Sequence, residues 1–289
     1  MFEGSGVALV TPFKNGKIDE AALTRLIEEQ IAAGTKLLVP CGTTGESATL
    51  SHEEHDRVVE ITVEAAKKRA KVLAGAGSNS TDEAIRLTKQ AQHSGADGAL
   101  HICPYYNRPT QEGLYRHFEA VAKASGLPIV LYNIPGRTGV NMLPKTVARL
   151  AKIEQIVGIK EASSVGQVSD LIEQCPPSFE VLSGEDALTF PMLALGAKGS
   201  ISVTANVLPK ACAEMYQAAT AGDWAKAKKI HFELAVMNRI LFIETNPAPV
   251  KAALGLMKKI DPELRLPLAP LSDESLAELK IALQSYSLL

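Results

Sequence analysis

Residues 156–163 read Ile-Val-Gly-Ile-Lys-Glu-Ala-Ser, so that Lys160 ends a short apolar run rich in β-branched residues. Such a run predicts a strand, and a side chain at its end lies in surroundings poor in water. Desolvation disfavours the ammonium form and lowers the pKa, and a neutral amine can attack a carbonyl group to form a Schiff base. The alternative is a lysine that extends to solvent and pairs with a carboxylate such as Glu161. This stretch alone leaves both interpretations open.

Similar apolar runs recur along the chain and alternate with longer segments of helical period, from residue 6 to about residue 220. Strands that alternate with helices form a parallel sheet, and eight such repeats predict a (β/α)8 TIM barrel. A doubly wound open sheet is the alternative, but it would break the regular repeat, and Gly75-Ala76-Gly77 lacks the rest of a dinucleotide-binding motif. We predict the strands at Gly6–Val10, Lys36–Val39, Val72–Gly75, Gly98–Ile102, Pro128–Tyr132, Ile156–Lys160, Phe179–Ser183 and Gly199–Ser202.

Amphipathic segments between these runs predict the helices of the barrel. Two of them begin with a capping-box pattern, Ser51-x-x-Glu54 and Ser80-x-x-Glu83, in which the two side chains bond backbone amides of the first turn reciprocally. We predict helices at Glu20–Ala33, Glu53–Lys68, Asp82–Ser94, Gln111–Ala124, Lys145–Ala151, Gly166–Gln174 and Ala187–Leu195.

The pattern becomes purely helical after residue 220, with helices predicted at Asp223–Glu244, Ala248–Lys258 and Ser272–Ser285. Proline-rich breaks separate these helices, and no low-complexity or charged linker precedes them. We therefore expect a barrel over residues 1–222 and a C-terminal helical appendage over residues 223–289 that packs as part of the same unit.

Composition excludes several classes of protein. Hydrophobic residues make up 46% of the chain and charged residues 21%, and the formal net charge is −2, so no basic surface for nucleic acid is expected. The N-terminal residues show no secretory pattern, and no apolar run is long enough to cross a bilayer. We expect a cytoplasmic protein that binds small molecules, with no nucleic-acid or membrane partner.

Neither a metal nor a cofactor is predicted. The four cysteines are widely separated and form no Cys-x-x-Cys pair, which argues against a disulfide framework and a zinc site. His52 and His55 lie three residues apart at a predicted helix start, and this spacing is compatible with a metal site, but no third ligand is evident.

Polar residues gather at the carboxyl ends of the predicted strands, where barrels of this type carry their catalytic groups. Tyr132 ends the strand next to that of Lys160, so its phenol is within reach of the amine and can transfer protons. Thr43 and Thr44 lie in a glycine-bounded turn that can hold a carboxylate, and Arg137 can clamp another. The plainer readings are a core tyrosine, ordinary turn residues and a surface arginine.

Two adjacent tyrosines, Tyr105 and Tyr106, lie in the short loop Pro104–Pro109. Two aromatic side chains in such a loop rarely serve only the core. We expect them to form a lid over the site, an interface with another subunit, or both.

Five motifs, taken together, resemble one family over essentially the whole chain. They are Gly42–Ser47, Pro104–Pro109, Tyr132–Gly139, Gly158–Ala162 and Ser183–Asp186. The chain is similar to the dihydrodipicolinate synthase family of the class I pyruvate-dependent aldolases and lyases. Within that superfamily, Arg137-Thr138-Gly139 resembles the synthases more than the sialic-acid lyases.

The resemblance implies an enzyme whose Lys160 forms a Schiff base with pyruvate. The resulting enamine attacks the aldehyde of L-aspartate-4-semialdehyde, and cyclisation releases a heterocycle of the diaminopimelate route to lysine. Tyr132, Thr43 and Tyr106 would form a proton relay. Tyr106 would reach into a neighbouring subunit's site, because the usual assembly is a homotetramer, a dimer of dimers.

The resemblance also assigns substrate-binding and regulatory roles. Thr44 would hold the pyruvate carboxylate and Arg137 the semialdehyde carboxylate, while Gly184 and Ile201 would line the pocket through backbone groups. In inhibited members of the family, feedback L-lysine binds at positions that this chain matches, and we predict inhibition by L-lysine, with His55 and Glu83 as a polar pair. The matching residues are Ser47, Ala48, His52, His55, Asn79, Glu83 and Tyr105.

Two other functions remain open at this point. A sister aldolase would join pyruvate to another aldehyde, and a non-catalytic barrel would bind a metabolite without covalent chemistry.

The alternation of side chains along a strand sends Glu161 to the opposite face from Lys160, so we expect a free, desolvated amine.

Overall fold

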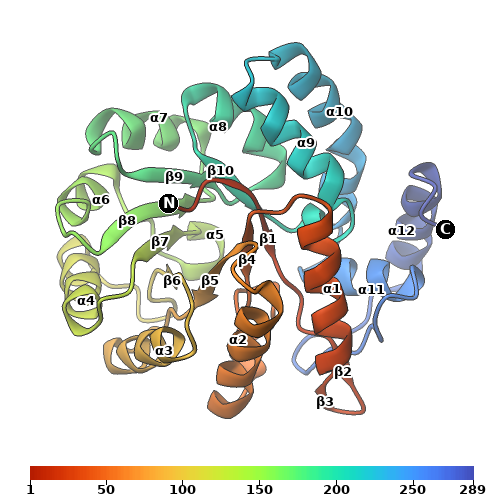
Figure 1. The fold of residues 1–289 in the computed structure, drawn as a ribbon, viewed down its shortest axis with the longest axis horizontal. Coiled ribbons are helices and arrows are strands. Elements are labelled where there is room, and N and C mark those ends of the chain that lie inside the picture. Colours follow the sequence, from red (N-terminus) through yellow and green to blue (C-terminus); the bar gives the residue numbers. More distant parts are fainter.

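The computed structural model describes residues 1–289, and its eight long strands close into a parallel barrel in the order β1-β10-β9-β8-β7-β6-β5-β4 (Figure 1). The predicted TIM barrel is therefore confirmed, and each strand lies within two residues of its predicted bounds. The strands are β1 (Gly4–Ala8), β4 (Leu37–Val39), β5 (Lys71–Gly75), β6 (Gly98–Ile102), β7 (Ile129–Asn133), β8 (Ile156–Glu161), β9 (Glu180–Ser183) and β10 (Gly199–Ser202).

Helices surround the barrel (Figure 1), and seven of them overlap the predicted ranges. They are α1 (Glu20–Ala32), α2 (His52–Ala66), α3 (Thr81–His93), α4 (Gln111–Ala124), α6 (Pro144–Leu150), α7 (Val165–Gln174), α8 (Thr189–Leu195) and α9 (Pro209–Thr220). The sequence patterns predicted no helix at Pro209–Thr220. They also missed the shortest elements, which hold too few residues to show a period. These are the hairpin β2 (Phe13–Lys14) and β3 (Lys17–Ile18), helix α5 (Pro135–Thr138), and the 3₁₀ turns η1 (Ser47–Thr49), η2 (Asp186–Leu188) and η3 (Thr204–Asn206).

Of the two predicted capping boxes, one is confirmed. At the start of α2 the Ser51 hydroxyl accepts from the Glu54 amide at 3.2 Å, and the Glu54 carboxylate accepts from the Ser51 amide at 2.9 Å. The prediction for α3 is wrong, because Ser80 caps nothing with its side chain. Glu83 instead accepts hydrogen bonds from the Ser78 hydroxyl and pairs with a ring nitrogen of His52.

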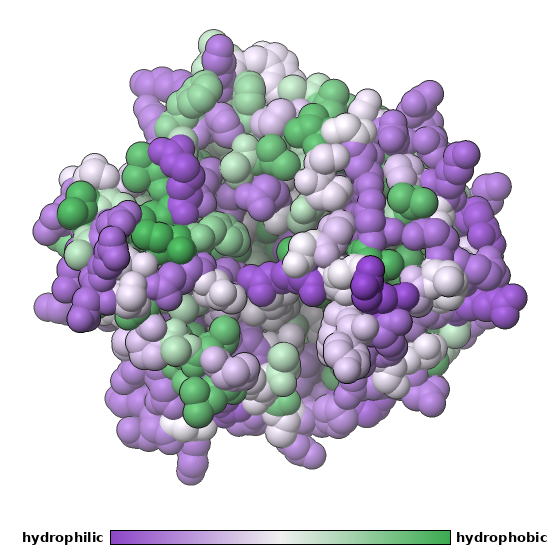
Figure 2. Space-filling view, turned by 180° about the vertical axis from the view of Figure 1, so that it is seen from behind, coloured by the Kyte–Doolittle hydropathy of each residue, from purple (hydrophilic) through white to green (hydrophobic).

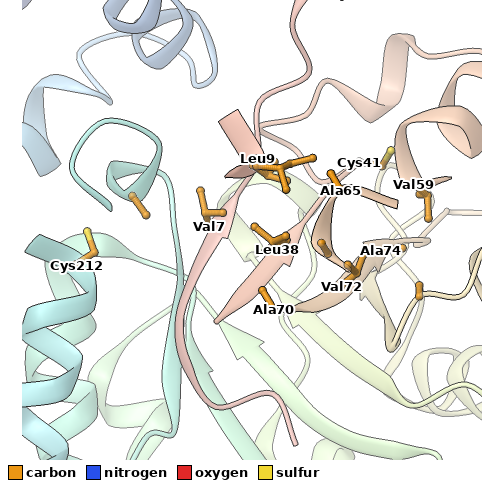
Figure 3. Close-up of a cluster of buried hydrophobic side chains, with 14 of the residues drawn as sticks. Val7, Leu9, Leu38, Cys41, Val59, Ala65, Ala70, Val72, Ala74 and Cys212 are labelled. Carbon is orange, nitrogen blue, oxygen red and sulfur yellow. The ribbon is translucent and has the colours of Figure 1, made fainter. Parts of the chain in front are cut away.

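The core has an inner and an outer layer. Inside the barrel, side chains such as Phe2, Leu73 and Tyr132 pack together. Between the barrel wall and the helices, residues such as Val7 and Val72 form a second cluster, which Figure 3 shows in the region of β1, β4, β5 and α2. Strands buried on both faces explain why they read as continuous apolar runs rather than as alternating patterns.

The C-terminal region forms three helices, α10 (Trp224–Ile240), α11 (Ala248–Leu256) and α12 (Asp273–Ser285). Figure 1 shows α11 and α12 on the side of the barrel where α1 lies. Their apolar side chains share one cluster with residues of the barrel, among them Val10 and Val203. The division at residues 222 and 223 stays a prediction; it falls in the turn between α9 and α10.

The surface is mixed in character. Figure 2 shows hydrophilic side chains over much of the face seen from behind, with hydrophobic ones in small separate groups. No helix combines the length and the apolar character that crossing a bilayer requires.

A buried ion pair fastens the C-terminal region to the barrel. Lys251 of α11 donates to the Glu46 carboxylate at 2.6 Å and to the Thr11 carbonyl at 3.0 Å, and both charged side chains are fully buried. The other Glu46 oxygen accepts from the Arg265 amide at 3.1 Å. Burial lowers the pKa of Lys251, against the attraction of Glu46. Glu46 lies two residues after Thr44, so this ion pair holds the turn that carries Thr43 and Thr44.

Replacing Lys251 by methionine should therefore destabilise the protein by about 3–5 kcal/mol, because an unpaired carboxylate stays buried. The double variant Lys251→Met, Glu46→Gln should lose clearly less stability than Lys251→Met alone, because no uncompensated charge remains buried. Urea unfolding at one fixed protein concentration measures both effects. A double variant as unstable as the sum of the two single variants would contradict this account.

Candidate active site

Lys160 ends β8 inside the mouth of the barrel, with only 6% of its surface exposed. Strand β7 pairs with β8 in a register that sets Tyr132 opposite Lys160. As a result the Lys160 Nζ atom lies 4.2 Å from the centre of the Tyr132 ring. The structure thus brings together the two residues that the sequence placed on neighbouring strands.

The Lys160 amine lies in an environment that favours its neutral form. Burial lowers its pKa to about 8, although the Asp186 and Glu185 carboxylates attract the proton and raise it, while Arg137 repels it. With this pKa, roughly a tenth of the amine is unprotonated at pH 7, far more than for an ordinary lysine, and the neutral form is the one that nucleophilic attack requires.

Glu161 does not neutralise this lysine. Its side chain points to the other face of β8, where it accepts hydrogen bonds from Gln167 at 2.9 Å, from Asn133 at 3.1 Å and from the Ser163 amide at 2.8 Å. Burial raises the pKa of Glu161, and these three donors oppose that rise. The expected opposite orientation is confirmed, and the ion pair between Lys160 and Glu161 is excluded as an explanation.

A cavity opens above Lys160 at the carboxyl ends of the strands. Among the predicted site residues, its lining includes Thr43, Thr44, Tyr132, Arg137, Lys160 and Gly184. Gly184 lies close against the lysine, because a Cβ atom there would be 3.0 Å from both Cγ and Cε of Lys160. A side chain at position 184 would therefore require the lysine side chain to shift.

The threonine turn follows β4 and is held by backbone bonds from Gly45 and Ser47 to the Gly42 carbonyl. Thr44 is 2% exposed, and its hydroxyl accepts from the side-chain amide of Asn246 at 3.0 Å. Thr43 lies beside the phenol of Tyr132. Burial raises the pKa of Tyr132, while Arg137 and the Thr43 side chain lower it. The phenol therefore stays protonated and can donate a proton.

Arg137 lies on α5, directly after β7, and its Nη2 donates to the Asn246 carbonyl at 3.1 Å. Asn246 itself lines the cavity, as do Glu185 and Phe242, and all three were missed by the sequence analysis. The only sequence feature at Asn246 is that it begins the proline-rich break before Ala248. Such a break indicates the boundary of a helix and does not indicate a binding site.

Two predicted residues do not line this cavity. Tyr106 is 90% exposed on its loop, with a left-handed φ of +71°. Ile201 is 1% exposed and packs in the barrel interior, in the same cluster as Tyr132. The chain alone therefore provides neither of these two contacts to a ligand in the cavity.

Most residues of the predicted lysine site gather outside the barrel mouth. Glu83 bonds the His52 ring at 3.0 Å and the Ser78 hydroxyl, and the Asn79 side chain donates to the Tyr105 carbonyl at 3.3 Å. Ser47 and Ala48 form part of η1, immediately before α2.

The predicted pair of His55 with Glu83 is wrong. His55 is buried on the inner face of α2, and its Nε2 bonds the Gly75 carbonyl at 2.7 Å. Its Nδ1 lies 3.6 Å from the Asp56 carboxylate. The partner of Glu83 is His52, three residues earlier, which points to the outer side of the helix. No three His, Cys, Asp or Glu side chains gather as a metal site would need.

Comparison with known proteins agrees with this geometry. The model of the dihydrodipicolinate synthetase family matches residues 1–286. The chain belongs to this family. A protein of Syntrophus aciditrophicus (strain SB) named 4-hydroxy-tetrahydrodipicolinate synthase is 59% identical over the whole of both chains. The family and the lyase function predicted from the sequence are confirmed by these matches.

Solved structures of the family superpose closely. The chloride-inhibited dihydrodipicolinate synthase from Acinetobacter baumannii, complexed with pyruvate, is 47% identical, with a TM-score of 0.98 and full coverage of both chains. DHDPS from Cyanidioschyzon merolae with lysine bound is 39% identical, with a TM-score of 0.96 over 100% of this chain and 99% of that one.

Proposed function

We propose that this protein is a lyase that condenses pyruvate with L-aspartate-4-semialdehyde to form 4-hydroxy-tetrahydrodipicolinate. The observation that carries the proposal is the buried, unpaired Lys160 amine beside the Tyr132 phenol, at the mouth of a barrel whose relatives carry the synthase name. A barrel that only binds a metabolite has no need for a desolvated amine, which is costly to bury.

The reaction begins when the neutral Lys160 amine attacks the keto carbon of pyruvate. A carbon–nitrogen bond forms, the keto oxygen leaves as water, and an iminium ion remains. Loss of a proton from the methyl group gives an enamine, whose carbon attacks the aldehyde carbon of the second substrate while the aldehyde oxygen takes up a proton. The amino group of that substrate then replaces Lys160 at the former keto carbon, which closes the ring and frees the lysine.

We assign the proton transfers to Tyr132, assisted by Thr43 and by Tyr106. The Tyr132 phenol lies against the amine and keeps its proton, so it can supply one to the departing oxygen and recover it later. Tyr106 is too exposed to act within its own chain. We propose that it enters the site of a second copy in a homotetramer, a dimer of dimers.

The carboxylates of the substrates require fixed donors. Thr44 presents a hydroxyl in the cavity and suits the pyruvate carboxylate, and Arg137 at the rim suits the semialdehyde carboxylate. The pocket-lining role proposed for Gly184 rests on its backbone groups, and Gly184 also leaves room for the Lys160 side chain.

We also propose feedback inhibition by L-lysine at the cluster of His52, Glu83 and Asn79. The Glu83 carboxylate can accept the ammonium group of an amino acid, and its hydrogen bonds to Ser78 and His52 lower its pKa, so it is charged at neutral pH. Tyr105, Ser47 and Ala48 complete the proposed site, whereas His55 is turned inward to the Gly75 carbonyl.

Borohydride reduction in the presence of pyruvate should attach the reduced pyruvate to Lys160, as peptide mass spectrometry would reveal. Lys160→Arg should abolish both the adduct and the turnover of pyruvate with L-aspartate-4-semialdehyde, whereas Lys210→Arg, at an exposed lysine, should change neither. No adduct would refute Schiff-base catalysis. An adduct without turnover of the semialdehyde would point to an aldolase with another acceptor.

The pH dependence of kcat/KM for pyruvate should follow the Lys160 amine. Because the neutral form reacts and its pKa lies at about 8, kcat/KM should rise through that pH and then level off. Glu185→Gln removes a charge that raises this pKa, so its midpoint should move to lower pH. Glu154→Gln, at an exposed position, is the matched control. A midpoint unmoved by Glu185→Gln would contradict the assignment.

Turnover should fall in millimolar L-lysine, and Glu83→Gln should raise the inhibitory concentration by about tenfold or more, because a charge-assisted hydrogen bond contributes roughly 1.5–3 kcal/mol. Asp82→Asn removes the same charge one residue earlier and should leave inhibition unchanged. Turnover of the unaltered protein that does not respond to lysine would refute the regulatory site.

A further inference from the structure

Asn246 connects the two proposed carboxylate-binding residues, although it belongs to the C-terminal region. It lies between α10 and α11, is 4% exposed and lines the cavity. Its side-chain Nδ2 donates to the Thr44 hydroxyl at 3.0 Å, and its backbone carbonyl accepts from Arg137 at 3.1 Å. One residue from outside the barrel thus touches both groups.

The bond to Thr44 decides where the threonine proton points. A hydroxyl has one proton and two lone pairs, and an amide NH2 can only donate. Thr44 Oγ1 therefore accepts from Asn246 and keeps its own proton for another acceptor. Thr44 lines the cavity, so a ligand oxygen is the acceptor that this arrangement serves.

The remaining amide atom has no partner within the protein. The Asn246 Oδ1 atom is buried and has no hydrogen-bond partner, and Asn246 lines the cavity. A buried polar atom without a partner is costly unless a ligand or a water satisfies it. The Asn246 side chain therefore has Thr44 as its one hydrogen-bond partner within the protein, and its Oδ1 is left for a ligand or a water.

The segment is also anchored close to this contact. Five positions further along, Lys251 bonds Glu46, two residues after Thr44. The C-terminal region therefore holds the threonine turn at two points, at Thr44 itself and at Glu46.

We propose that Asn246 is a positioning residue that holds the Thr44 hydroxyl as a donor toward the carboxylate of pyruvate. The inference rests on the function proposed above. The side chain acts on Thr44 alone, because Arg137 is held by the backbone carbonyl, which any substitution retains. Asn246 therefore serves the first substrate through its side chain and the second through its backbone.

A double-mutant cycle tests this role with Asn246→Ala, Thr44→Val and the double variant. Asn246→Ala should raise KM for pyruvate about tenfold, the effect of about 1.4 kcal/mol, while KM for L-aspartate-4-semialdehyde stays within about twofold. The double variant should have the pyruvate KM of Thr44→Val alone, because the amide acts only through the hydroxyl. Gln174→Ala, at an exposed amide of α7, is the control.

Asn246→Asp gives a second, independent reading. A carboxylate accepts only, so it would take the Thr44 proton and repel the substrate, and this variant should raise KM for pyruvate at least as much as Asn246→Ala. The role is overturned if Asp is tolerated, if the single effects multiply in the double variant, or if both substrates lose affinity alike.

The borohydride adduct of the unaltered protein distinguishes a failure of the proposed function from a failure of the proposed role of Asn246. An adduct at Lys160 together with a cycle that shows no coupling overturns the role of Asn246 and leaves the proposed function standing. Absence of the adduct overturns both.

Discussion

The active site depends on keeping the Lys160 amine shielded from water and away from any close carboxylate. Water would stabilise the ammonium form of Lys160, and a close carboxylate would do the same, so the mouth of the barrel must exclude both. Three features serve this end. The barrel interior below is filled with apolar side chains, the Tyr132 ring covers one side of the amine, and Gly184 leaves room for the lysine stem.

The outward side of β8 shows how the neighbouring carboxylate is kept away. Glu161 is held on the far face by Asn133, Gln167 and the Ser163 amide, which together satisfy its oxygens in a buried place. Strand geometry alone separates the two side chains, since successive residues point to opposite faces. The hydrogen bonds then stabilise the carboxylate where it cannot reach the amine.

The sequence predicted what depends on local pattern. Lys160 and Tyr132 end neighbouring strands, and the parallel barrel brings such ends together without further information. Asn246 and Lys251 could not be predicted in the same way, because their partners lie 202 and 205 residues away and an asparagine before a proline is typical of any turn. The C-terminal helices were predicted as helices, but no local pattern shows which residues of the barrel they contact.

The wrong predictions, of a capping box at Ser80 and Glu83 and of a pair between His55 and Glu83, concern side chains that have several possible hydrogen-bond partners. The pattern Ser80-x-x-Glu83 predicts a cap, but Glu83 can bond one backbone amide or two side-chain groups, and Ser78 together with His52 is the better set of partners. The same choice explains His55. Helical period turns it inward to the Gly75 carbonyl and turns His52 outward, and a spacing of three residues cannot tell which histidine meets the carboxylate.

The balance at Lys160 also explains why Asp186 is tied to backbone amides. This buried carboxylate accepts from the amides of Val203 at 2.9 Å and Thr204 at 3.1 Å, and it attracts the lysine proton only from a distance. A carboxylate moved to 4 Å from the amine would stabilise the ammonium by about 4 kcal/mol at an effective dielectric constant of 20. That is about three pKa units, enough to cancel the fall of the lysine pKa from 10.5 to about 8. The amides of Val203 and Thr204, which hold Asp186 away from the amine, therefore act together with burial to keep the Lys160 pKa low.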